Sequence, residues 1–203
     1  MSAAVLKRRS FKDPARLPLV GDQTLLRGRV HEFCGPARET AALWLARATD
    51  GPLIWIAPAF ARESLHMEGL RAFIDPGRLL IVSPDRAVDL LWSMEEALRS
   101  GTAALIVTEL SDPPALTPVR RLTLAAEAGA ALTGHAPTGV ILTPGDGGAA
   151  GVESRWHLSP RHHGEARIWH LERRRARLEP PKAWTVTATS RDFLLEAAAL
   201  AGT

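Results

Sequence analysis

Apolar residues recur along this chain in two alternating patterns, as short continuous runs and as longer stretches with helical spacing. Four short runs lie between Gly35 and Leu142, and each is flanked by Gly, Pro or Asp residues. Runs of this length predict buried strands, and the longer stretches between them predict helices that cover a parallel sheet. The predicted strands span residues 53–56, 79–82, 103–107 and 139–142. The pattern therefore predicts an α/β fold with a mostly parallel sheet flanked by helices.

Helix-forming residues fill the segments before and between these runs, at 39–48, about 64–73 and 115–129. Another helix is expected after Ser83-Pro84-Asp85, because this tripeptide supplies a capping hydroxyl, a first-turn proline and an acid near the positive end of the helix dipole. The apolar residues that follow recur every three or four positions and so share one helix face. They are Ala87, Leu90, Leu91, Met94 and Leu98.

Beyond Gly151 the pattern changes to strict alternation of apolar and polar residues, which is typical of antiparallel strands. We expect three such strands within about residues 152–188, extending the sheet. The last segment, about residues 191–200, is rich in Leu and Ala and is predicted to be a helix. Residues 1–30 contain charges and prolines without sustained periodicity, so they are predicted to form a basic arm that precedes a single domain at 31–203.

Charge is distributed unevenly along the chain. Residues 1–30 hold seven basic and two acidic side chains, residues 31–150 hold nine and fourteen, and residues 151–182 hold eight and four. Basic ends therefore flank an acidic middle. Such asymmetry is compatible with nucleic-acid binding, because cations that neutralise phosphates release counterions. It is equally compatible with chance clustering on a solvated surface.

The composition narrows the classes of protein that the chain can represent. No stretch approaches the roughly 20 apolar residues of a membrane span, and no apolar run follows the N-terminal charges as in a secretory signal. The single cysteine, Cys34, excludes an internal disulfide, and no cysteine pairs with the histidines at 157, 162, 163 and 170 to suggest a zinc site. We expect a cytoplasmic protein without metal or other cofactor.

Several collinear segments resemble the core of the RecA recombinase family. The run from Leu79 to Asp85, continuing through Glu96–Gly101 into a strand that ends at Glu109, resembles the family's run from the third core strand to the Walker B strand. Upstream, His31–Pro36 lies where the family places its phosphate loop. Downstream, Pro180-Pro181-Lys182 is similar to a family proline pair between antiparallel strands. The resemblance covers about residues 31–188 and implies a RecA-like core.

Within this superfamily the chain is more similar to ImuA-type proteins, the short RecA relatives of bacterial mutagenesis cassettes. The segments that carry this likeness are Leu91–Gly101, Arg120–Glu127 and the stretch that begins at Ser154-Arg155-Trp156. The resemblance implies a role in SOS-induced, error-prone translesion synthesis. It also implies three partners: RecA itself, a Y-family polymerase homologue and an error-prone polymerase subunit.

The residues that an ATPase of this superfamily needs are missing. A phosphate loop requires G-x-x-x-x-G-K-[ST], because backbone N–H groups and a lysine surround the phosphates. Here the corresponding segment provides no lysine in either alignment: Thr40-Ala41-Ala42 without a gap, or Arg38-Glu39-Thr40 with a two-residue gap. In the second alignment Glu39 would repel the phosphates.

Two further acids of the ATPase are also affected. The segment Ala57–Ala61 after the first predicted strand supplies no carboxylate to activate water, and Glu109 stands alone where the family has the Walker B aspartate. The degenerate nucleotide site therefore comprises Gly35, Pro36, Arg38, Glu39, Thr40 and Glu109. We predict no nucleotide hydrolysis.

Basic side chains provide the candidate contacts to DNA or to an acidic partner. Guanidinium groups pair with phosphate and carboxylate alike, although alternate residues of a strand point to opposite faces. The glycine-rich loop 144–151 falls where RecA proteins bind DNA, but it contains Asp146 and no cation, so a mobile connector is the simpler interpretation. The candidates are Lys7, Arg8, Arg9, Lys12, Arg155, Arg161, Arg167, Arg173, Arg174, Arg175 and Arg177.

These observations favour a non-catalytic adaptor in DNA-damage tolerance. Two alternatives stay open at this point. The first is a residual nucleotide-binding ATPase that uses Arg38, Thr40 and Glu109. The second is an inhibitor of cell division like other degenerate RecA relatives, because a shared fold does not determine function.

Overall fold

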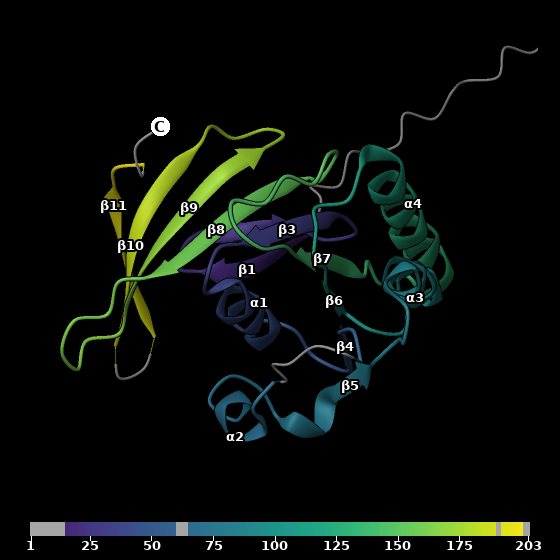
Figure 1. The fold of residues 1–203 in the computed structure, drawn as a ribbon, viewed down its shortest axis with the longest axis horizontal. Helices are drawn as coiled ribbons and strands as arrows, with labels where there is room; N and C mark the ends of the chain where they lie inside the picture. The colour runs from purple at the N-terminus through teal and green to yellow at the C-terminus, as the bar shows by residue number, and fades with distance from the viewer. Residues whose placement is uncertain (1–14, 60–64, 190–191, 201–203) are drawn as a thin grey trace, which may run out of the picture.

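The computed structural model describes residues 15–59, 65–189 and 192–200. Within them, eleven strands and four α-helices form an α/β structure around one large mixed sheet (Figure 1). The strands are β1 (Arg16–Val20), β2 (Gln23–Leu26), β3 (Val30–Cys34), β4 (Leu53–Ile56), β5 (Leu79–Val82), β6 (Leu105–Glu109), β7 (Thr138–Leu142), β8 (Ser154–Pro160), β9 (Ile168–Ala176), β10 (Lys182–Ala188) and β11 (Phe193–Ala198). The helices are α1 (Arg38–Arg47), α2 (Met67–Leu70), α3 (Ala87–Ser100) and α4 (Leu116–Thr133), with a 3-10 turn η1 (Pro76–Arg78).

The large sheet has nine strands in the order β11-β10-β9-β8-β3-β7-β6-β4-β5. The five neighbouring pairs from β8 to β5 are parallel, and the three pairs from β11 to β8 are antiparallel. Short apolar strands alternate with helices in the first part, whereas hairpins connect the strands of the second part. The α/β class and the antiparallel extension are confirmed, and the sheet as a whole is mixed.

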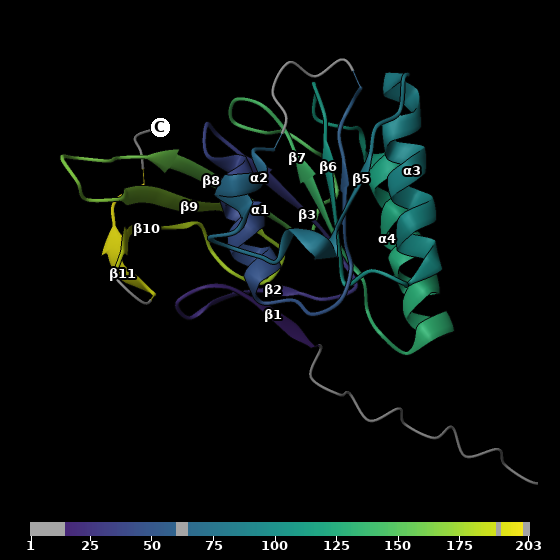
Figure 2. The ribbon, with the colours of Figure 1, turned by 90° about the horizontal axis from the view of Figure 1, so that it is seen from below.

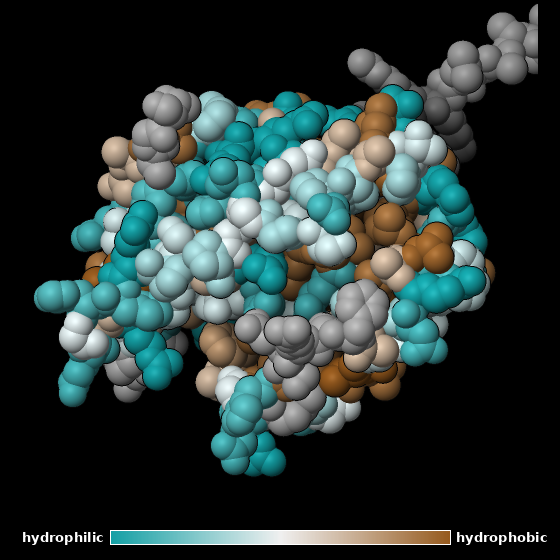
Figure 3. All heavy atoms as spheres, in the orientation of Figure 1, coloured by the Kyte–Doolittle hydropathy of each residue, from teal (hydrophilic) through white to brown (hydrophobic). Residues whose placement is uncertain are grey.

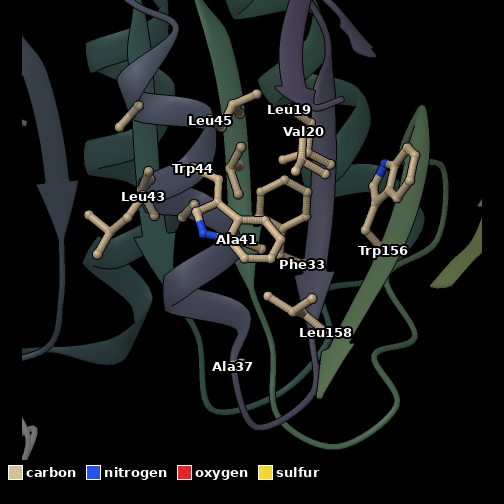
Figure 4. Packing of buried hydrophobic residues seen from close by; sticks show 14 of the residues in the cluster. Leu19, Val20, Phe33, Ala37, Ala41, Leu43, Trp44, Leu45, Trp156 and Leu158 are labelled. Carbon is tan, nitrogen blue, oxygen red and sulfur yellow. The ribbon is translucent and has the colours of Figure 1, made fainter. Parts of the chain in front are cut away.

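Two layers cover the parallel part of the sheet. Helix α1 and the β1–β2 hairpin lie on one face, and α3 and α4 lie side by side on the other (Figure 2). On the first face, Leu45 of α1 and Leu19 of β1 pack with Phe33 of β3 (Figure 4). On the second face, Met94 and Leu98 of α3 are fully buried with Ile106 of β6. Of the apolar face predicted for α3, Leu90, Met94 and Leu98 are buried and Leu91 is partly buried, whereas Ala87 at the start of the helix is exposed.

Alternation buries three tryptophans in the antiparallel part of the sheet. Trp156, Trp169 and Trp184 lie on the α1 side of β8, β9 and β10 and belong to the same core cluster as α1. Trp44 of α1 meets Trp169 edge to face, with ring centroids 5.2 Å apart. This geometry is favourable because the edge of one aromatic ring is positive and the face of the other is negative. One core therefore continues across both parts of the sheet.

Both predictions for the chain ends need correction. The predicted C-terminal helix at about 191–200 is wrong, because Phe193–Ala198 is strand β11, paired antiparallel with β10. The predicted arm at 1–30 is wrong for its second half, where β1 and β2 form a hairpin that buries Leu17 and Leu25. Burial against α1 compensates for the weak local pattern of this segment. Residues 1–14, with Lys7, Arg8, Arg9 and Lys12, lie outside the described residues.

The strand 79–82 was predicted to be buried, and this prediction is also wrong. β5 is the edge strand of the sheet, and three of its four apolar side chains are exposed. A continuous apolar run predicts a strand but cannot distinguish a central position from an edge. Among the described residues, no helix is both long and apolar enough to cross a membrane.

Candidate functional site

The carboxyl ends of β3, β4, β6 and β7 meet at one edge of the parallel sheet, the place where open α/β sheets bind ligands. The loop of residues 35–37 connects β3 to α1 at this edge. Glu109 ends β6 at the same edge. The fold thus brings the residues of the predicted degenerate nucleotide site to the sheet edge at which open α/β sheets bind ligands.

The backbone of this loop donates its hydrogen bonds within the protein. Gly35 N donates to the Gly145 carbonyl at 2.9 Å, and Ala37 N donates to the Leu158 carbonyl at 3.0 Å. Arg38 N donates to the Gly35 carbonyl at 3.3 Å, and Pro36 has no N–H. A phosphate loop instead directs these amides at the ligand. Here the amides of Gly35, Ala37 and Arg38 donate to carbonyls of the protein instead.

Gly35 adopts a backbone conformation that also brings β8 close to the loop. Its φ is +86°, in the left-handed region that favours glycine. A Cβ at this position would lie 2.6 Å from the Leu158 carbonyl oxygen and 2.7 Å from His157 Nε2. The glycine therefore permits a tight contact between the loop and β8.

The side chains of α1 do not replace the missing lysine. Arg38 donates from Nη1 to the Gly35 carbonyl at 3.4 Å and forms an ion pair with Glu39 at 3.6 Å. Thr40 is half-buried. Ala41 and Ala42, the lysine and hydroxyl positions of the ungapped alignment, are buried in the core. A lysine at position 41 would therefore point into the core and away from the sheet edge.

Glu109 takes part in the packing of neighbouring strands. Trp55 of β4 is fully buried, and its Nε1 donates to Glu109 Oε1 at 2.6 Å. The carboxylate thus satisfies an indole N–H that would otherwise lack a partner in the core. The part of the chain that the structure describes holds no group of three or more His, Cys, Asp or Glu residues arranged to bind a metal ion.

The glycine-rich loop 144–151 is anchored by a buried carboxylate that sequence reasoning did not single out. Glu32 lies in β3 and is completely buried. It accepts hydrogen bonds from Thr143 Oγ1 at 2.7 Å, from Gly148 N at 2.8 Å and from Ala149 N at 3.1 Å. Arg155 Nε donates to the same carboxylate and forms an ion pair with it. The loop was expected to be a mobile connector, and the structure instead shows it held at its centre by Glu32.

A signal for Glu32 does exist in the sequence. It is an acidic residue inside the strand Val30–Cys34, whose other members include apolar residues that are fully buried. A charge in such a strand requires a partner, because burial of an isolated carboxylate costs several kcal/mol or more. The partner, Arg155, is 123 residues away in the chain, and only the parallel pairing of β3 with β8 brings it close.

The strongest charge run in the sequence, residues 173–177, does not form a binding patch as a whole. Arg173 is buried, and its guanidinium carbon lies 5.6 Å from the Trp156 ring centroid and 5.4 Å from that of Trp184. Its Nε donates to the Pro180 carbonyl at 3.1 Å, and Nη1 pairs with Glu179. These contacts make Arg173 part of the core, because cations stack favourably on aromatic faces.

Two other candidate arginines are engaged inside the protein. Arg155 is held by Glu32 and also donates to the Ala149 carbonyl at 2.9 Å. Arg174 bridges Glu172 at 2.8 Å and Asp146 at 2.7 Å, so it ties β9 to the glycine-rich loop. The neighbouring guanidinium lowers the pKa of the Asp146 carboxyl. Neither arginine is available to phosphate without loss of these pairs.

Of the candidate arginines between residues 155 and 177, four are exposed: Arg161, Arg167, Arg175 and Arg177. The first two flank the β8–β9 hairpin, and the other two lie at the opposite end of β9, with Arg177 3.7 Å from Glu153. The nine residues of β9 separate the two pairs by about 30 Å. The candidates thus form two small basic regions and no continuous stripe.

The four histidines of this region do not converge on one point. His162 and His163 are exposed in the β8–β9 hairpin, whereas His157 is buried beside Gly35. Desolvation lowers the pKa of His157, and the nearby Arg174 lowers it further. Its Nδ1 is buried without a hydrogen-bond partner among the described residues.

Comparison with known proteins finds no family model and no curated sequence that matches the chain.

Proposed function

We propose that this protein is a non-catalytic adaptor that has kept an α/β scaffold of RecA type and lost nucleotide binding. The observation that carries the proposal is the internal hydrogen bonding of Gly35 and Ala37, whose amides donate to carbonyls of residues 145 and 158. A phosphate group would have to displace these carbonyls and would gain no lysine in return. The hydrogen bond from the Trp55 indole to Glu109 also disfavours nucleotide binding, because it engages the carboxylate within the protein.

The partners in this proposal come from the resemblance to ImuA-type proteins. We propose that the chain acts in the cytoplasm during SOS-induced translesion synthesis and binds RecA, a Y-family polymerase homologue or an error-prone polymerase subunit. The exposed arginines at 161, 167, 175 and 177 are the proposed contacts to an acidic partner surface or to DNA. Arg173 is excluded from this set because it is buried between two tryptophans.

Isothermal titration calorimetry with ATP and magnesium tests the loss of nucleotide binding. We expect no saturable heat and no phosphate release from the purified full-length chain. The adaptor proposal would be overturned by ATP hydrolysis that disappears on Glu109→Ala, since this outcome would identify the carboxylate as a metal-binding group.

Co-purification tests the partner part of the proposal. A tagged chain recovered from DNA-damaged cells is expected to retain one of the three partners, and the double variants Arg161→Ala/Arg167→Ala and Arg175→Ala/Arg177→Ala identify which basic region is used. Arg120→Ala on α4 is the matched control, because Arg120 is also exposed but lies in another element. Retention of none of these partners by the wild-type chain would contradict the proposed role in translesion synthesis.

A further inference from the structure

Five exposed apolar side chains lie on β5 and on the first turns of α3, with Leu80 and Val82 on the α3 side of the sheet and Ile81 on the opposite side. Leu80, Ile81 and Val82 of β5 are 55%, 50% and 38% exposed, and Val88 and Trp92 of α3 are 70% and 59% exposed. Val82 and Trp92 line one open groove between the strand and the helix. We call these five residues the β5 surface, and Figure 3 shows hydrophobic surface over β5. Exposed apolar side chains that lie side by side, as Val82 and Trp92 do, mark interaction sites.

The backbone of β5 is also available for pairing. Among the described residues β5 has one neighbouring strand, β4. The Val82 carbonyl accepts from Ala57 N at 3.1 Å, which shows that Val82 directs its backbone groups toward β4. Because these groups alternate along a strand, the N–H and C=O of Ile81 point away from β4. An exposed apolar edge of this kind is a template for another strand.

We propose that β5 pairs antiparallel with β5 of a second copy of this chain, about a two-fold axis at Ile81. Antiparallel pairing requires outward-facing residues to lie opposite each other. With Ile81 opposite itself, Leu80 of each copy lies opposite Val82 of the other, and both pairs sit on the α3 side. Shifting the register so that Leu79 lies opposite Ile81 would place Val82 against Arg78. The apolar pattern of β5 therefore selects the Ile81 register.

The charged side chains beside the β5 surface do not oppose the approach of the same surface on a second copy. A two-fold axis brings identical surfaces together, so unpaired charges of one sign at the rim would repel. Here Arg86 pairs with Asp89 at 2.8 Å, and Arg121 pairs with Glu95 at 2.7 Å. Antiparallel pairing also places Arg78, which precedes β5, at the end of the interface where the second copy carries Asp85. Among the described residues, the Arg86–Asp89 and Arg121–Glu95 pairs thus leave no excess charge of one sign on α3 and α4 beside the β5 surface.

The size of the surface indicates a weak dimer. The exposed parts of the five side chains amount to about 500 Å² per copy, so the pair would bury at most about 1,000 Å² of this apolar surface, at the low end of specific interfaces. We therefore expect a concentration-dependent dimer with a Kd in the micromolar range. This inference goes beyond the proposed function and does not depend on it, because the dimer forms whether or not a repair partner binds.

Sedimentation velocity of the full-length chain between roughly 1 and 200 µM tests the inference. We expect a shift from monomer to dimer across this range. Ile81→Pro removes the outward N–H, which an edge strand tolerates, and is expected to keep the chain monomeric with an unchanged far-UV spectrum. Trp92→Ser should weaken the dimer about tenfold, whereas Leu124→Ser is the control, since Leu124 is equally exposed on α4.

Disulfide trapping tests the register separately from any effect of proline on folding. The natural cysteine, Cys34, is buried, so an introduced thiol at the β5 edge is the accessible one. A mixture of Leu80→Cys and Val82→Cys proteins should form the mixed disulfide dimer in preference to either homodimer, because residues 80 and 82 lie opposite each other. A mixture of Leu124→Cys and Val82→Cys should form no preferred species.

A monomer at every concentration, or a dimer that survives both Ile81→Pro and Trp92→Ser, would overturn the proposal. The proposal would also be overturned if the wild-type chain is monomeric and captures a partner, whereas the Ile81→Pro variant does not capture it. That result would assign the β5 surface to a strand of the partner. The adaptor proposal would survive this last result, since partner capture by the wild-type chain supports it. The two proposals therefore fail on different measurements.

Discussion

The Glu32 carboxylate determines how the residues around the β3–α1 loop are arranged. It binds the side chain of Thr143, two amides of the glycine-rich loop and the guanidinium of Arg155. The loop held in this way presents the Gly145 carbonyl to Gly35 N. One buried residue thereby connects β3, the glycine-rich loop and β8.

We predict that Glu32→Gln lowers the free energy of unfolding by about 3 kcal/mol. Removal of one partner of a buried ion pair leaves the other charge unpaired in the interior, here Arg155. Urea denaturation measures the change. Glu96→Gln is the control, because Glu96 pairs with Arg99 at the surface and its loss should cost under about 1 kcal/mol. Equal effects of the two substitutions would contradict the anchoring role of Glu32.

His31 makes the stability of the protein depend on pH. Its ring is buried, with Nε2 2.9 Å from the Leu26 carbonyl and Nδ1 2.7 Å from Ser154 Oγ. Desolvation lowers the pKa of His31 from 6.5 to about 4. The folded state therefore binds its proton later than the unfolded state as the pH falls. Stability from this group is complete above pH 6.5 and is lost between pH 6.5 and about pH 4.

The predicted loss over this interval is about 3 kcal/mol from His31 alone. Urea denaturation at pH 7.5, 5.5 and 4.5 should show a steeper decline for the wild-type chain than for His31→Gln, which does not titrate and keeps an N–H for the Leu26 carbonyl. His162→Gln is the control, since His162 is exposed. Parallel pH profiles for the wild-type chain and His31→Gln would refute the assignment.

The sequence alone shows which residue type stands at each position, but it does not show which of these side chains are buried. The missing lysine and the lone Glu109 are visible in the letters alone. The fate of Arg173 is not, because its burial depends on two tryptophans contributed by β8 and β10. A run of arginines on a strand alternates between faces, which predicts that its members differ but does not say which of them is buried.

At the scale of elements, apolar runs and alternation predicted the strands well, and β11 shows why one prediction failed. The segment Phe193–Ala198 contains Leu, Glu and Ala, which favour helices. Tertiary context overrides this preference, since β10 offers an open edge and Phe193 packs against Trp44 with ring centroids 4.8 Å apart. A long-range contact of this kind leaves no periodic signal in six residues.

The crossing of α3 and α4 provides a prediction that opposes helix propensity. Gly129 lies inside α4, where alanine would ordinarily be favoured by about 1 kcal/mol. A Cβ at this position would lie 2.1 Å from the Leu98 carbonyl oxygen of α3, which is a backbone atom and cannot move alone. The two helices approach closely because residue 129 has no side chain.

We therefore predict that Gly129→Ala lowers the free energy of unfolding by about 2 kcal/mol or more, as expected for overpacking of a close contact. Thermal or urea denaturation measures it. Gly69→Ala in α2 is the matched control, since nothing lies within 4 Å of the added Cβ and the substitution should be neutral or stabilising. Stabilisation by Gly129→Ala would show that the helices separate without cost.

At the scale of the whole molecule, the parallel and antiparallel parts of the sheet share one core. The cluster on the α1 side contains Leu53 and Val107 from the parallel strands together with Trp169 and Val186 from the antiparallel strands. Helix α1 touches both parts through Trp44. The change of apolar pattern at Gly151 is visible in the sequence, and such a change can mark a domain boundary. In this protein the two parts form one unit, because side chains from both are buried in the same cluster.

We predict that the described part of the chain unfolds as one cooperative unit. Far-UV circular dichroism reports mainly α1, α3 and α4 around the parallel strands, while three of the six tryptophans report the antiparallel strands through fluorescence. The two urea transitions should coincide. Val186→Ala in β10 removes fully buried methyl groups and should shift both midpoints together, by about 2 kcal/mol. A shift confined to fluorescence would divide the chain into two separately folding units, because the α1 core would then fail to transmit the loss from β10 to the parallel strands.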